Sequence, residues 1–168
     1  LTRLQRWLQA VYEIDVDYDV MDFLITDQAL AQTLQGDASR AACPEKLLLY
    51  QAPGELAITL YLAPEVLAGL ATGNVARSPQ DAQAFCQAIE GVSHFLYLAW
   101  RAGFDRELTQ LELELQAEID KFIGLLVLNG AAQPPDGTSL CSWLFDHATF
   151  EQGLDPQTLA RYQAAHFY

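Results

Sequence analysis

The sequence predicts an α+β fold: a small three-stranded antiparallel sheet in the N-terminal part, covered by a mainly helical C-terminal part with a long antiparallel helix pair. Three observations predict it. Residues 46–51 and 55–62 are mostly apolar runs on either side of a Pro-Gly pair. Residues 18–25 form an earlier run rich in β-branched and aromatic side chains. Two long stretches of helical periodicity follow.

The hairpin is the clearest of the expected strand elements. Pro53 presets the first central φ of a type II turn, and Gly54 accepts the positive φ of the second. The composition of residues 18–25, YDVMDFLI, predicts the third strand. The strand-containing part of the chain is therefore expected at about residues 12–62.

Helical patterns precede and follow these strands. Residues 1–14 carry an apolar stripe at helical spacing. Thr26 or Asp27 caps a short helix that Gly36 ends, and Pro64 opens another. These start and stop signals predict three short helices around the sheet.

The long helix pair begins at Ser78, a cap residue followed by Pro79. An apolar stripe runs from there to Gly103, and a second starts at about Arg106. A short connection predicts that these helices pack antiparallel. Beyond them we expect a loop, a short apolar helix at 139–145 and a last helix after Asp155-Pro156, which together complete a helical part at about 64–168.

Length and composition predict one domain, residues 1–168, with a folded rather than a disordered composition. The last residues stop inside a helical pattern, so we expect the C-terminus to continue beyond the printed chain. No apolar run reaches the roughly 18 residues that cross a bilayer, so no membrane span is expected. Three widely spaced cysteines form no disulfide framework and no thiolate zinc site, which suits a soluble protein of the reducing cytoplasm.

The formal net charge of −13 repels phosphate backbones, so direct nucleic-acid binding is not expected. The same charge favours a partner protein with a basic surface. Acidic residues alternate through EIDVDYDVMD, but the pattern lacks the Gly and Glu of a calcium loop, where Val20 and Thr26 stand. We interpret Asp15, Asp17 and Asp19 as a solvated strand face, with a docking surface for a basic partner as the functional alternative.

The candidate site residues lie on the two long helices. Glu90, His94 and Arg101 share one helical face, and Glu114 and Glu118 follow on the 107–121 helix. Glu90, His94 and Arg101 are the candidate catalytic residues, with Arg101 holding an anionic group. Glu and His at this spacing can also bind a divalent metal, so the candidate ligands are His94, Glu90, Glu114 and Glu118, with Asp120 as a further carboxylate. The competing interpretation is a set of ordinary helix-surface pairs, among them Glu90–His94 and Glu118–Lys121.

Specific catalytic motifs are absent from the sequence. There is no HExxH zinc motif, no G-x-S-x-G nucleophile elbow and no phosphate-binding glycine loop. Cys141 and Ser142, beside His147, are candidate nucleophiles by residue type only. The sequence thus favours an acidic protein–protein interaction or regulatory module over an enzyme. The alternative is a metal-assisted hydrolase or acid–base enzyme that uses Glu90 and His94 with carboxylates of the 107–121 helix.

Overall fold

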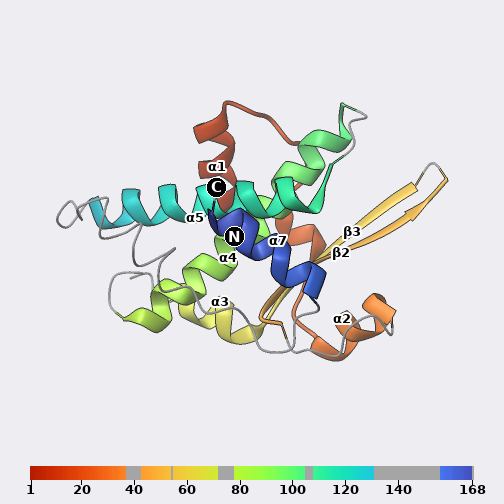
Figure 1. Cartoon of the computed structure of the whole chain (residues 1–168), viewed down its shortest axis with the longest axis horizontal. Coiled ribbons are helices and arrows are strands. Elements are labelled where there is room, and N and C mark those ends of the chain that lie inside the picture. Colours follow the sequence, from red (N-terminus) through yellow and green to blue (C-terminus); the bar gives the residue numbers. More distant parts are fainter. Residues whose placement is uncertain (37–42, 54, 72–77, 105–107, 131–155, 168) are drawn as a thin grey trace.

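The computed structural model describes residues 1–36, 43–53, 55–71, 78–104, 108–130 and 156–167 (Figure 1). The described elements follow the expected order of early strands and later helices. Their bounds are α1 (Thr2–Tyr12), the 3-10 helix η1 (Val20–Phe23), β1 (Leu24–Ile25), α2 (Gln28–Gln35), β2 (Glu45–Ala52), β3 (Glu55–Leu62), α3 (Pro64–Ala71), α4 (Pro79–Ala102), α5 (Gln110–Gly130) and α7 (Pro156–Phe167). The α+β class is confirmed.

The sheet has three strands in the order β1-β3-β2. β2 and β3 form the expected antiparallel hairpin, in register from Glu45 opposite Leu62 to Ala52 opposite Glu55. β1 instead runs parallel to β3, so the sheet is mixed, and the expectation of a wholly antiparallel sheet is wrong in this detail. β1 pairs with the inner half of β3, where Leu24 lies opposite Leu60.

Most of the expected strand at 18–25 is not a strand. The carboxylate of Asp19 accepts a hydrogen bond from the backbone N–H of Met21 and from the hydroxyl of Thr2, and η1 begins at the next residue. A short acidic side chain that bonds its own backbone competes in this way with a strand ladder. The alternating acids before it therefore lie on a connecting segment, and only residues 24 and 25 pair with β3.

Two of the predicted N-cap residues, Asp27 and Ser78, cap the helices that follow them. The Asp27 side chain accepts from the N–H groups of Ala29 and Leu30, and the Ser78 side chain accepts from that of Asp81. α5 begins at residue 110, later than expected, because Thr109 and Glu112 form a reciprocal capping box. The expected start near Arg106 and the expected helix at 139–145 lie outside the described residues.

α4 lies at the centre of the fold. It packs against α5, α3, α1 and the β2–β3 hairpin. Its core stripe is confirmed, since Phe85, Ile89, Val92 and Leu96 are all buried. Gly124 of α5 faces this stripe so closely that a Cβ there would lie 2.7 Å from Cδ1 of Ile89. Glycine therefore permits the close approach of the two long helices.

α5 runs back along α4, as the contacts between the two helices show. Glu112 meets Arg101 near the connection, Glu114 meets His94, and Lys121 meets Glu90 further along. The positions rise on α5 as they fall on α4, which is the antiparallel arrangement. None of the helices in the described ranges combines the length and apolarity that crossing a membrane requires.

Candidate functional site

Six charged side chains from β2, α4 and α5 gather between the hairpin base and the two long helices. We call this set the buried charged cluster: Glu45, Glu90, His94, Glu114, Glu118 and Lys121. Glu45, His94 and Glu118 are each less than one-tenth exposed. Because ionisable groups are seldom buried without partners, the arrangement needs a physical explanation.

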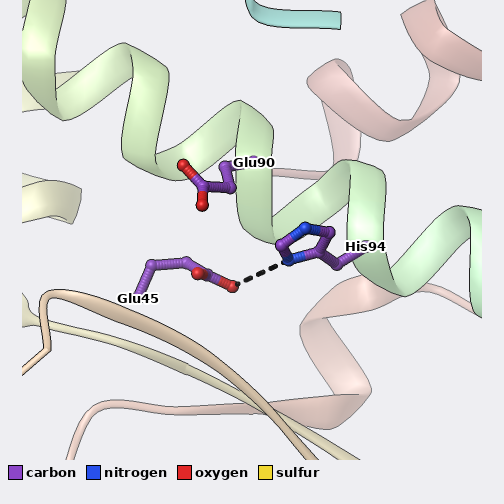
Figure 2. Close-up of side chains that lie close together, drawn as sticks. All are labelled: Glu45, Glu90 and His94. Atoms are coloured by element: carbon purple, nitrogen blue, oxygen red, sulfur yellow. Dashed lines mark ion pairs between the residues drawn. The ribbon is translucent and has the colours of Figure 1, made fainter. Parts of the chain in front are cut away.

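His94 lies between two carboxylates. Its Nδ1 is 3.6 Å from Oε1 of Glu45, and its Nε2 is 3.7 Å from Oε2 of Glu114. Figure 2 shows Glu45 reaching His94 from the start of β2, while Glu90 extends from α4 one turn before the histidine. Both separations suit ion pairs but exceed hydrogen-bond length. The structure therefore brings Glu90, His94 and Glu114 together, as the sequence analysis expected of the metal-ligand candidates.

Lys121 is the permanent cation of the cluster. Its Nζ lies 3.3 Å from Oε2 of Glu90 and 2.6 Å from Oε1 of Glu118. Only 12% of the Lys121 side chain and 8% of the Glu118 side chain are exposed. The interpretation of Glu118–Lys121 as an ordinary surface pair is therefore wrong. The carboxylate of Glu118 forms a buried ion pair with Lys121.

Glycine lets Glu45 reach the helix. A Cβ at position 91 of α4 would lie 2.9 Å from Cδ1 of Leu60, 3.0 Å from Cγ of Glu45 and 3.2 Å from its Oε1. Gly91, the residue after Glu90 on α4, has no side chain and therefore leaves room for the carboxylate of Glu45. Sequence reasoning missed Glu45. The available signal was this glycine inside a strongly helical stretch, because a residue without a side chain permits the close approach of another group.

The cluster shifts the protonation of its members. Burial alone lowers the pKa of His94, but contact with Glu45 and the charges of Glu45, Glu90 and Glu114 raise it overall to about 9. Burial raises the pKa of Glu114 to about 7, against the opposing charge of His94, and also raises that of Glu45. The site therefore holds protons on groups that are ordinarily free of them near neutral pH.

Arg101 occupies a different position from the other candidates. Its guanidinium lies 3.2 Å from Oε1 of Glu112 and 5.7 Å from the centre of the Tyr97 ring, near the C-terminal end of α4. These contacts tie it to the start of α5. The candidates Cys141, Ser142 and His147 lie outside the described residues.

A second set of polar side chains joins the end of α1 to α5. The hydroxyl of Tyr12 donates a short hydrogen bond to Asp120, and Nε2 of Gln116 donates to both. These residues line a cavity of about 270 Å³. Its wall also includes Ile14, Ser93, Leu96, Tyr97 and Trp100. Asp120 therefore belongs to this cavity, where burial raises its pKa, rather than completing the set around His94.

Comparisons with protein-family models, with curated proteins and with solved structures gave no match for this chain.

Proposed function

We propose that this chain is a protein–protein interaction module whose partner presents apolar side chains together with lysine and arginine. The observation that carries the proposal is the course of the β2–β3 hairpin. Its inner half packs on the core, and its outer half extends away from the helices (Figure 1). The partner would cover this outer half.

One face of the hairpin is mostly apolar from the core outwards, with Gln51 opposite Leu56 near the tip. The strand register places Leu47 opposite Leu60 and Leu49 opposite Ile58. Leu60 is fully buried, whereas Leu49 is 50% exposed and Leu56 is 41% exposed. An apolar face that begins in the core and continues into solvent is typical of a binding surface, because isolated two-stranded ribbons have little stability of their own.

The acidic segment 13–22 supplies charge near the base of this hairpin. Its last three residues belong to η1, which packs against β3. Buried Gln5 fixes the segment, since its amide donates to the carbonyl of Tyr18 and its Oε1 accepts from the N–H of Val20. Asp15 and Asp17 are exposed on it. Exposed negative charges on a fixed segment increase the rate of association with a basic protein and make the complex sensitive to salt.

The alternative of a metal-assisted hydrolase receives less support. The six residues of the buried charged cluster are mostly enclosed, and the 270 Å³ cavity is lined by other side chains. A hydrolase needs a reacting atom beside the activated water. A buried set of carboxylates and a histidine can also hold an ion without being such a site.

The test compares the wild-type chain with the double variant Leu49→Ser/Leu56→Ser. A protein captured from cell extract by the wild type is purified, and its affinity for both chains is measured by isothermal titration calorimetry. We expect the double variant to bind at least about 30-fold more weakly, the loss that follows when apolar hot-spot contacts worth about 2 kcal/mol are removed. Raising NaCl from about 50 to about 300 mM should weaken the wild-type complex further.

Ile119→Ser is the matched control, because Ile119 is an apolar residue that is 49% exposed and belongs to α5, not to the hairpin. It should bind as the wild type does. Equal binding by the hairpin variant, or binding that ignores salt, would refute the proposal. So would sedimentation velocity showing that a second copy of this chain covers the hairpin.

A further inference from the structure

Two atoms of the buried charged cluster have no hydrogen-bond partner among the described residues. They are Oε1 of Glu45 and Nε2 of His94, and both residues are more than nine-tenths buried. Leaving a buried polar atom unsatisfied is costly, so Oε1 of Glu45 points to a missing partner, whereas Nε2 of His94 faces Oε2 of Glu114 at 3.7 Å. The ligand atoms of Glu45, Glu90 and His94 all lie within 4.8 Å of one another.

We propose that Glu45, Glu90 and His94 bind a divalent transition-metal ion, with Glu114 holding the imidazole in its binding orientation. The proposal does not depend on the proposed interaction function. It assigns Glu45, at the start of β2, as the ligand that joins the hairpin base to α4 (Figure 2).

The spacing of the ligand atoms supports a shared ion rather than direct contact. Nδ1 of His94 and Oε1 of Glu45 are 3.6 Å apart. Two atoms that bind one tetrahedral ion at about 2.1 Å each lie about 3.4 Å apart. The observed gap is therefore too long for a hydrogen bond but close to the separation of two ligands on the same ion. Glu90 completes the set by a side-chain shift of at most about 1.4 Å, since its ligand atom lies within 4.8 Å of the other two.

Two of the three ligands, Glu90 and His94, have a charged neighbour that leaves one donor atom for the ion. Oε2 of Glu90 engages Lys121, so its second oxygen can face the metal. Nε2 of His94 faces Oε2 of Glu114, so Nδ1 can face the metal. A metal-bound histidine whose other ring nitrogen donates to a carboxylate is the usual arrangement in proteins, because the carboxylate fixes the ring and its tautomer. Glu114 and Lys121 are thus positioning residues for this site.

The charge of the cluster also favours a divalent cation. It contains four carboxylates, Glu45, Glu90, Glu114 and Glu118, and one permanent cation, Lys121. Excess negative charge in a mostly buried site is compensated by protons or by a metal ion. An ion can reach the site at Glu90 and Glu114, whose side chains are 17% and 14% exposed.

The donor set selects the class of metal. One imidazole nitrogen and carboxylate oxygens, with no thiolate, suit Zn²⁺, Mn²⁺ or Fe²⁺ better than Cu⁺, which prefers sulfur. Ca²⁺ takes six or more oxygen ligands, which this set does not provide. The ion would fix the base of the β2–β3 hairpin against α4, since the ligands come from both elements.

The experiment measures binding of Zn²⁺ and Mn²⁺ to the full chain, purified without a histidine tag and stripped with EDTA. We expect one ion per chain by elemental analysis after dialysis, and a higher melting temperature with metal than without it. Glu114→Gln should weaken binding by about 10- to 100-fold, as removal of a carboxylate behind a ligand does, and His94→Gln should weaken it more.

Glu112→Gln is the matched control, because Glu112 is a carboxylate of α5 that pairs with Arg101 outside the cluster. It should bind metal as the wild type does. Circular dichroism in EDTA checks that each variant is folded, and Glu114→Gln decides if His94→Gln does not fold. Pulsed EPR of the Mn²⁺-loaded wild type should detect an imidazole nitrogen bound to the metal.

Two results would overturn the assignment. The first is a folded wild-type chain that binds neither Zn²⁺ nor Mn²⁺ with a Kd below about 10 µM. The second is unchanged affinity in the folded cluster variants, which would place the bound metal on other residues. Because no partner protein enters this experiment, its failure would leave the interaction proposal standing.

Discussion

Replacing Lys121 by methionine tests whether the buried charged cluster is held together by its one permanent cation. Methionine keeps most of the side-chain length but removes the charge that lies 3.3 Å from Glu90 and 2.6 Å from Glu118. The three side chains are 12%, 17% and 8% exposed, so water compensates the two carboxylates poorly. Breaking a buried ion pair by removing one partner costs about 3–5 kcal/mol.

The loss should be visible in urea unfolding of the EDTA-treated protein. For a domain of this size it corresponds to a fall in melting temperature on the order of 10 °C. Glu112→Gln serves as the control, because it removes the charge of Glu112, whose side chain is 40% exposed, while glutamine preserves the capping box with Thr109. If Lys121→Met costs no more than this control, the cluster is not the enclosed charge network that the distances indicate.

Two further substitutions test the packing and protonation around the helix pair. Burial raises the pKa of Asp120 above its ordinary value of 3.8, so the folded state binds this proton more tightly and its contribution to stability is lost as pH rises through the folded-state pKa. Asp120→Asn, which can still accept from Tyr12, should therefore melt above the wild type at about pH 8 and lose that advantage towards pH 4, and lower melting at both pH values would contradict this. Gly124→Ala places a Cβ 2.7 Å from Cδ1 of Ile89 and should cost about 1–3 kcal/mol in urea unfolding, whereas an unchanged midpoint would show that α4 and α5 separate easily.

The helical part of the fold was predictable because its signals are local. Ser78 and Pro79 mark the start of α4, and apolar positions at three- and four-residue spacing mark its buried face. The hairpin was predictable because Pro53 and Gly54 separate two apolar runs. Each of these patterns acts within a few residues, so tertiary structure has little opportunity to override it.

The errors arise where contacts between distant parts of the chain decide the local structure. Residues 18–25 have the composition of a strand, but Asp19 bonds the N–H of Met21 and the hydroxyl of Thr2, which lies 17 residues away. Composition alone does not show that competition. The parallel pairing of β1 with β3 was equally hidden, because strand order depends on the path of the chain between the strands and not on the strands themselves.

The contacts in the buried charged cluster also fall into those that the sequence could predict and those that it could not. Antiparallel packing of α4 and α5 is enough to bring Glu114 to His94 and Lys121 to Glu90, so these meetings follow from the helix pattern. Glu45 comes from a strand 45 residues before Glu90 in the chain, and no periodicity connects the two. What connects them is Gly91, where any larger residue would meet Glu45 and Leu60. A glycine inside a helix lowers its stability by roughly 1 kcal/mol relative to alanine, and at this position it permits the close approach of another group. Here that group is a buried carboxylate, which makes the Gly91 contact the strongest structural reason to treat Glu45 as part of the site.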